Sequence, residues 1–451
     1  MTFVWSYPNY KTVKYLIGIF VLLAAYPQTG TAQWYNKQFV IGTFSDPRIS
    51  RDNDKVKDSI SFQYAKSAYF NLLSGPQFYN GARDYSLMDK TLTLASRFGM
   101  HVLLIDSKLR VADSSFRKED AMNIISYFKS VDKSKRDAIG GYYFSGEFPK
   151  KKAGQIKYWT GFFKNNDPDK MAYSYLLPSY AFKSRSEYED YLDNYLSGNG
   201  TDKPEVIAYD HYPFVGGNAT LSSYFYNLNI IKQKAGSTPF WYYILTTTKK
   251  TDPADVNDYQ LKFMAYCPLA YGAKGVIYYT YETIPDNHGW NYRDAIIGRD
   301  GRPTTKYNTA KKINEYLKEV AGPVILRSKN IATLHVSEQP TGEDLPSASL
   351  LRSNKSIVTD VNSPQLLLGI FKDNNGAKSY LMVINKASSD ANSVIVTLAG
   401  KKNVSQYPQS DNYNGQLSVT PITENYNARR NTTSFSIQNL GGGEMALFEI
   451  N

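Results

Sequence analysis

The sequence predicts an α/β fold, a (β/α)8 barrel followed by a smaller all-β sandwich. Eight short runs rich in Val, Ile, Leu, Tyr and Phe recur at nearly equal spacing, and the gaps between them are polar with helical periodicity. This alternation is typical of strand–helix units around a closed parallel sheet, whose functional residues follow the carboxyl ends of the strands. The runs begin at Phe39, Ala68, His101, Ala138, Met171, Val206, Phe240 and Gly275.

The expected strands, in order, are 39–44, 68–73, 101–106, 139–144, 171–177, 206–210, 240–245 and 275–281. Between them, several segments carry apolar residues at three- and four-residue intervals, as helices on an outer barrel wall should. These segments are 85–98, 118–129, 154–163 and 221–232. An open doubly wound sheet is the alternative. No Gly-rich phosphate-binding loop follows the first run, and eight near-equal units favour closure.

The pattern of apolar and polar residues changes after a last predicted helix, which ends at Gly322 and Pro323. Short alternating runs then follow one another, separated by Asn, Asp, Gly and Ser turns. This pattern is typical of an antiparallel β-sandwich. We therefore expect three parts: an export signal over 1–32, the barrel over 33–323, and the sandwich over 324–451.

The first 32 residues have the pattern of an export signal. Lys11 and Lys14 precede the apolar run 15–25, and small residues at 30–32 offer a cleavage site. A membrane anchor is the alternative, but the run is shorter than the roughly 20 residues that a spanning helix needs. We expect a secreted or periplasmic protein with no stable membrane insertion once the signal is removed.

Composition and charge limit the classes of molecule that we expect the protein to bind. The net charge is +11, but the basic residues are scattered, so we expect no nucleic-acid partner. The single cysteine, Cys267, lies in an apolar helical segment and is interpreted as a buried hydrophobe. The 38 tyrosines suit sugar faces as well as ordinary packing.

Three predicted strands end in carboxylates. Glu147 follows the fourth run, Asp210 ends the sixth, and Glu282 follows the eighth. Cleavage of a glycosidic bond needs two carboxyl groups, one protonated and one ionised. Aromatic walls around such a pair raise one carboxyl pKa, which keeps that group protonated near neutral pH.

The remaining candidates are sugar contacts rather than metal ligands. The chain has only four histidines and neither an HExxH nor a Gly-x-Ser-x-Gly motif, so we expect no metal and no organic cofactor. A carbohydrate substrate would lie against aromatic and hydrogen-bonding side chains at the barrel mouth. The candidates are Asn71, His211, Tyr212, Trp241, Tyr243, Tyr281 and Trp290.

The order of these segments resembles that of secreted (β/α)8 glycoside hydrolases of the β-galactosidase-like group, which carry a C-terminal β-sandwich. The markers are the segments 141–149, 209–214, 270–281, 295–304 and 440–450. The resemblance implies that Glu147 holds the acid/base position. Two departures stand out: Gly146 occupies a position that is commonly Asn or Asp, and the seventh run ends in three threonines where the group has its nucleophilic Glu.

The leading hypothesis is an exported glycoside hydrolase that acts on a poly- or oligosaccharide. Glu147 would be the general acid, with Glu282, ranked before Asp210, as base or nucleophile. Strands four and eight lie on opposite sides of a barrel, which favours the wider, inverting separation of about 6.5 to 9.5 Å. The alternative is a carbohydrate-binding barrel that has lost its second catalytic carboxylate. Coordinates separate the two, because a hydrolase needs a second carboxylate facing Glu147.

Overall fold

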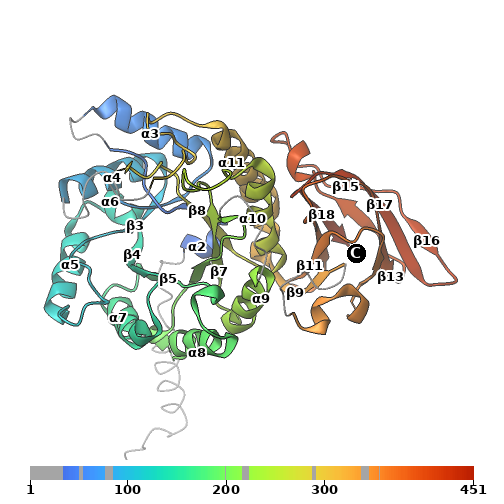
Figure 1. The fold of residues 1–451 in the computed structure, drawn as a ribbon, viewed down its shortest axis with the longest axis horizontal. Coiled ribbons are helices and arrows are strands. Elements are labelled where there is room, and N and C mark those ends of the chain that lie inside the picture. The colour runs from blue at the N-terminus through green and yellow to red at the C-terminus, as the bar shows by residue number, and fades with distance from the viewer. Residues whose placement is uncertain are drawn as a thin grey trace, which may run out of the picture.

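A computed structural model describes residues 34–49, 54–76, 85–198, 200–215, 223–286, 291–336, 345–354 and 356–451. The predicted export segment and Trp290 lie outside these residues. The predicted fold class is confirmed, because eight parallel strands close a barrel in the order of the chain (Figure 1). The strands are β1 (Val40–Thr43), β2 (Leu72–Gly75), β3 (His101–Leu104), β4 (Ile139–Gly146), β5 (Met171–Leu176), β6 (Ile207–Asp210), β7 (Phe240–Leu245) and β8 (Gly275–Tyr279).

Helices surround the barrel (Figure 1). They are α2 (Trp34–Lys37), α3 (Lys55–Ser67), α4 (Tyr85–Phe98), α5 (Lys118–Ser130), α6 (Lys133–Ala138), α7 (Ala153–Asn166), α8 (Arg185–Leu196), α9 (Tyr224–Ala235), α10 (Asp258–Ala270), α11 (Thr305–Tyr316) and α12 (Gly322–Arg327). Within the described residues, no helix is long and apolar enough to cross a bilayer.

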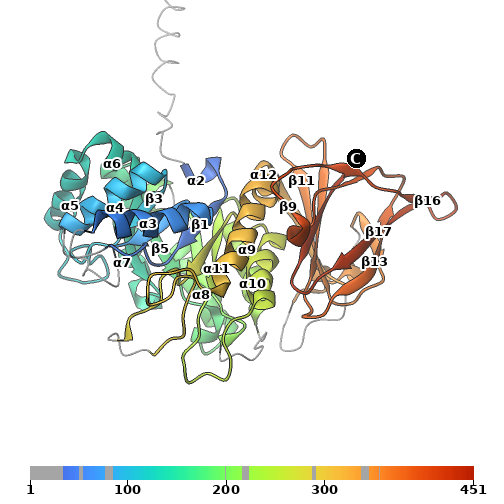
Figure 2. The same ribbon diagram turned by 90° about the horizontal axis from the view of Figure 1, so that it is seen from above.

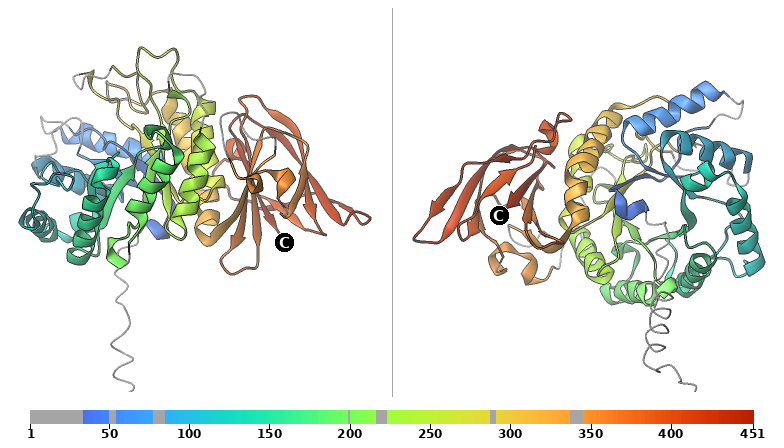
Figure 3. Two further views of the ribbon diagram at one scale, coloured as in Figure 1. Left: turned by 60° about the horizontal axis from the view of Figure 1, so that its bottom comes forward. Right: turned by 180° about the vertical axis from the view of Figure 1, so that it is seen from behind.

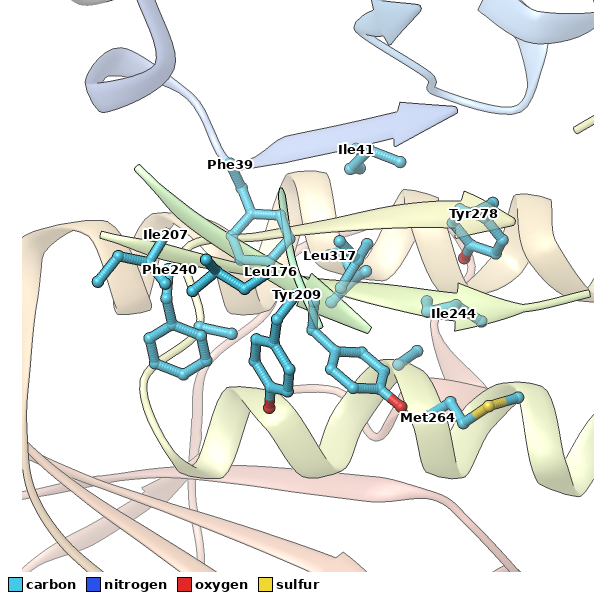
Figure 4. Packing of buried hydrophobic residues seen from close by; sticks show 14 of the residues in the cluster. Phe39, Ile41, Leu176, Ile207, Tyr209, Phe240, Ile244, Met264, Tyr278 and Leu317 are labelled. Atoms are coloured by element: carbon cyan, nitrogen blue, oxygen red, sulfur yellow. The ribbon is translucent and has the colours of Figure 1, made fainter. Parts of the chain in front are cut away.

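Alternation along each strand divides the barrel into two cores. On β7, Tyr242 and Ile244 face outward into the core shared with the helices, whereas Trp241 and Tyr243 belong to the inner core. Figure 4 shows Ile207, Tyr209, Phe240 and Ile244 between the strands and the helix that carries Met264. Since side chains on a strand alternate between its two faces, this parity decides which residues line the barrel interior.

The two ends of the barrel are different. The short helix α2 closes the end where the strands begin, with Trp34 stacked on His101 at a centroid distance of 4.2 Å and Tyr35 edge-on to Trp241 at 6.3 Å. Figure 3 shows α2 lying across the opening in the view from behind. Figure 2 shows the long loop between β8 and α11 at the opposite end. The candidate site must therefore form at the loop end, where the strands finish.

Several predicted strand limits move, among them the beginning of the second strand and the end of the eighth. The second strand begins at Leu72 rather than Ala68, because Ala68 caps α3 and Tyr69 takes a positive φ of 63°. The eighth strand ends at Tyr279, so the side-chain alternation of β8 stops before Tyr281 and Glu282. Continued alternation would have put Tyr281 on the inner face with Tyr279 and Glu282 on the outer face with Tyr278, so the shorter strand changes only the direction of Tyr281.

The C-terminal part is an antiparallel sandwich. One sheet has the order β10-β13-β17-β16 and the other β15-β14-β18-β12-β11-β9. The strands are β9 (Ser328–His335), β10 (Val358–Val361), β11 (Leu366–Asp373), β12 (Ser379–Asn385), β13 (Ala391–Ala399), β14 (Val404–Gln406), β15 (Thr420–Pro421), β16 (Asn425–Asn427), β17 (Thr432–Leu440) and β18 (Met445–Ile450). The second sheet packs closely on α10, because a Cβ at Gly369 would lie 2.8 Å from the Cα of Ala270.

Candidate functional site

A cavity of about 290 Å³ opens at the end of the barrel where the strands finish. The ends of β5, β6, β7 and β8 and the loops after β1, β4, β6, β7 and β8 contribute to its wall. Its lining residues are Phe44, Glu147, Tyr175, Asp210, Tyr212, Val215, Leu245, Thr247, Thr248, Lys249, Asp252, Tyr279 and Tyr292. Aromatic and carboxylate side chains thus converge on one small space.

Asp210 is the buried carboxyl of the cavity. It is the last residue of β6, and only 4% of its surface is exposed. Burial raises the pKa of Asp210 well above its usual range, and the charge of Glu147 and a hydrogen bond with Glu147 raise it further. A hydrogen bond from Tyr212 acts in the opposite direction. The surroundings of Asp210 therefore favour its protonated form.

Glu147 reaches the same cavity from the other side of β5. Its side chain is exposed, and its N–H donates to the carbonyl of Tyr175 at 3.0 Å. Its φ is 48°, in the left-handed region that costs a residue with a Cβ about 1 to 2 kcal/mol. Such strain persists only where surrounding structure imposes it, and it gathers at functional sites.

The ring of Tyr175 explains why residue 146 is a glycine. A Cβ built on Gly146 would lie 2.1 Å from the Tyr175 ring and 2.5 Å from its hydroxyl oxygen. The tyrosine therefore occupies the space that a side chain at position 146 would need. The departure from Asn or Asp at this position follows from an aromatic residue on the neighbouring strand.

The cavity has an aromatic floor. Tyr175 packs against Phe44 at a centroid distance of 6.3 Å, and Tyr212 faces Tyr279 at 5.8 Å. Burial raises the pKa of Tyr175 and of Tyr212 well above the usual range, so both hydroxyls remain hydrogen-bond donors. An aromatic floor with donors at its edge suits the C–H faces and hydroxyls of a sugar.

Glu282 lies elsewhere. It is completely buried behind the mouth, accepts from the backbone N–H of Arg48 at 3.1 Å, and forms an ion pair with the Arg48 guanidinium at 3.4 Å. Burial raises the pKa of Glu282 to about 7, and Arg48 opposes that rise. Glu282 does not line the cavity with Glu147, so the ranking of Glu282 before Asp210 loses its geometric basis.

Among the described sugar-contact candidates, Tyr212 alone lines the cavity. His211 is buried behind Asp210 and its Nδ1 contacts Asn227 Oδ1 at 3.2 Å. Tyr243 lies beneath the floor, against Tyr175 at 4.8 Å.

The other three candidates have structural contacts. Trp241 is deeper in the barrel, next to Tyr35. The Asn71 amide joins β1 to β2 by donating to Phe39 O at 2.8 Å and accepting from Ile41 N at 2.9 Å. Tyr281 packs on Phe70 outside the barrel.

Sequence reasoning missed the loop after β7. Thr247, Lys249 and Asp252 line the cavity, and Tyr292 joins them from the loop after β8. The two loops are tied together, since Arg293 N donates to Thr248 O at 2.9 Å and the Arg293 guanidinium donates to Asp252 O at 2.8 Å. The position of Asp252 shortly after a strand was a usable signal, but the fold of its loop was not.

A third carboxylate therefore faces the cavity. Asp252 is half-buried, and its Oδ2 accepts from the backbone N–H of Lys249 at 2.8 Å. Thr247, at the end of β7, donates its hydroxyl to Arg293 O at 2.7 Å. In the described part of the chain, no group of three or more His, Cys, Asp or Glu residues is arranged to hold a metal ion.

No protein-family model and no curated protein sequence matches this chain. Among solved structures it is similar to a β-galactosidase from Bacillus circulans sp. alkalophilus, with a TM-score of 0.55 and 9% identity over 91% of this chain and 99% of that one. A catalytic mutant of a GH42 β-galactosidase from G. stearothermophilus gives a TM-score of 0.51 and 8% identity over 94% and 99%. A noncanonic maltogenic α-amylase from Thermotoga neapolitana gives 0.50 and 10% over 92% and 99%. The chain thus has the fold of (β/α)8-barrel glycoside hydrolases.

Proposed function

We propose that this protein hydrolyses glycosidic bonds of a poly- or oligosaccharide in the cavity at the barrel mouth. The observation that carries the proposal is the meeting of Glu147 and Asp210 in one aromatic-lined cavity. A binding module needs aromatic surfaces and hydrogen-bonding groups, but it has no use for a buried carboxyl that retains a proton. The fold shared with glycoside hydrolases supports the same reaction class.

The environments of the two carboxyls suggest their roles. Asp210, buried and with a raised pKa, is the proton donor, and the exposed Glu147 is its hydrogen-bonded partner. This is the reverse of the assignment expected from the sequence. Two carboxyls that are hydrogen-bonded to one another act as a unit that carries one proton, because the repulsion between two close negative charges disfavours the loss of that proton until the leaving oxygen takes it. Glu147 stabilises the positive charge that develops on the sugar ring.

Asp252 is the remaining carboxylate of the cavity and the proposed base. The glycosidic C–O bond breaks with its electron pair on the leaving oxygen, which takes the proton of Asp210. A water oxygen bonds to the anomeric carbon, and its proton passes to Asp252. The half-buried position of Asp252 at the solvent side gives it access to that water.

The test is to incubate the purified mature protein with a panel of plant, algal and host glycans. Hydrolysis is measured as the release of reducing sugar. We expect turnover of at least one glycan, with activity lost in Glu147→Gln and in Asp210→Asn. Asp300→Asn, on the exposed part of the β8–α11 loop, is the matched control and should keep full activity. Full activity in both cavity variants would overturn the proposal.

A non-catalytic carbohydrate-binding barrel is the second candidate. It is favoured by the end of β7, where three consecutive threonines replace an acid and Thr246, Thr247 and Thr248 each donate a hydroxyl to a backbone carbonyl. Calorimetric binding of a glycan that the wild-type protein never cleaves would select this function.

We also propose that the protein is exported to the periplasm or the cell exterior. The charged and apolar pattern of residues 1–32 supports this proposal. Mass spectrometry of the protein from its native host should give a mature N-terminus near Gln33. An intact Met1 in the mature protein would contradict export with cleavage.

A further inference from the structure

A second, larger hollow lies between the barrel and the sandwich, away from the mouth. Its volume is about 630 Å³. It is bordered by the end of α9, the turn from α10 to β8, and the beginning of β9. Figure 1 and Figure 2 both show α9 beside β9, and Lys232 of α9 donates to Thr333 of β9 at 3.1 Å. Crevices between two folded units are frequent ligand sites.

The charged residues that line this crevice are all positive. Three lysines line it, Lys232 from α9, Lys274 from the turn before β8, and Lys329 from β9. Among its described lining residues there is no Asp or Glu. The hydroxyls of Ser237 and Thr238 lie on the same wall and can donate hydrogen bonds. The chain as a whole carries a net charge of +11, which adds to a positive potential in the crevice.

Two of these ammonium groups are desolvated. Burial lowers the pKa of Lys232 and of Lys274 to about 8. Lys232 and Lys274 are half-buried. The more deeply buried Lys306 shows how such a cation is usually neutralised, since its Nζ is 2.7 Å from a carboxylate oxygen of Asp255. Lys274 instead donates to the carbonyls of Ile325 and Ser328 at the end of α12. Neutral acceptors offset only part of the cost of burying a cation.

We propose that this crevice binds an oxyanion, a sulfate, phosphate or carboxylate group, through Lys232, Lys274 and Lys329. An anion would supply the negative charge that the lining residues lack, and its oxygens would accept the remaining N–H groups of the lysines. The volume leaves room for an acidic sugar as well as for an inorganic ion. This site is separate from the mouth and does not depend on the proposed hydrolysis.

The experiment is isothermal titration calorimetry of the full chain at constant ionic strength, with inorganic sulfate, inorganic phosphate and a sulfated disaccharide as probes. We expect saturable binding of at least one probe. Lys232→Met and Lys329→Gln should each weaken it by at least about tenfold. Lys329 is exposed, so its replacement keeps the proposal testable if Lys232→Met does not fold. Lys129→Met, at the end of α5, is the control and should bind like the wild type.

The relative affinities of the probes identify the ligand of the crevice. Tighter binding of the sulfated disaccharide than of sulfate would identify an anionic sugar as the ligand, whereas equal affinities would identify a free ion. The proposal is overturned if no probe binds saturably, or if Lys329→Gln binds as tightly as the wild type.

Discussion

Asp210 and Glu282 are two buried carboxyls at the same end of one barrel, and they have opposite surroundings. Both have a raised pKa because both are desolvated. Glu282 contacts the Arg48 guanidinium in a filled interior, while Asp210 contacts the Glu147 carboxyl beside a cavity. A carboxyl with a cation partner and no cavity stabilises loop packing. A carboxyl with an acidic neighbour and room for a ligand is arranged for proton transfer.

The comparison also separates burial from function. Sequence position alone favoured Glu282, since it follows an aromatic strand. The exposed fraction is 0% for Glu282 and 4% for Asp210, so burial does not distinguish them. The distinguishing observation is what each carboxyl faces, and the following predictions test it in order of expected effect.

Replacing Asp210 by Asn should have the largest effect. We expect kcat to fall between about a hundredfold and ten-thousandfold, the range of a lost general acid. The Tm at pH 7 should rise or stay the same, because the unfolded chain has released the proton that folded Asp210 retains at a free-energy cost. Initial rates and thermal unfolding measure both. A lower Tm together with unchanged kcat would place Asp210 in the same structural class as Glu282.

Glu282→Gln should change the pH dependence of stability. The folded pKa of about 7 exceeds the unfolded value of 4.5, so the folded protein binds one more proton between these values and loses stability as pH rises through them. At about 1.4 kcal/mol per pKa unit, the loss is about 3 kcal/mol. Urea unfolding from pH 4 to pH 8 should therefore show a flatter profile in the variant, with hydrolysis retained. A profile parallel to that of the wild type would contradict this explanation.

Asp252→Asn tests whether a third carboxylate completes the site. We expect kcat to fall about a hundredfold with little change in Tm, since the side chain is half-buried and its backbone is held by Arg293. Added azide, a small nucleophile that needs no base, should restore turnover in this variant and leave Asp210→Asn inactive. If Asp252→Asn kept the wild-type rate, Glu147 and Asp210 would be the only carboxyls that take part in the reaction.

Gly146→Ala should give the smallest effect and sharpens the account of Glu147. The new Cβ would collide with the Tyr175 ring, so we expect a destabilisation of about 1 to 3 kcal/mol. In a Tyr175→Ala background the same change should cost less than about 0.5 kcal/mol, because the collision is gone. Denaturant unfolding of the four proteins gives the coupling. Equal costs in both backgrounds would show that Tyr175 does not determine the residue at 146.

Much of the fold was readable from local pattern. The spacing of the apolar runs and the helical periodicity between them identified eight strand–helix units, and Asn, Asp and Gly turns identified the sandwich. The site was only partly readable. Glu147, Asp210 and Tyr212 line the cavity. Tyr281 turns away because β8 ends at Tyr279, and Glu282 contacts Arg48 instead. Trp241 and Tyr243, expected to contact sugar at the mouth, face the barrel interior below the cavity floor.

The sequence by itself determined the strand–helix repeat, the place of Asp210 at the end of β6, and the acid that follows β4. These depend on residue type and local spacing, which are properties of short segments. Only the tertiary structure decided that Asp210 faces Glu147, that Arg48 contacts Glu282, that Tyr175 occupies the space beside Gly146, and that Asp252 reaches the mouth. Each of these depends on loops or neighbouring strands that meet only when the barrel closes, so no local pattern encodes it.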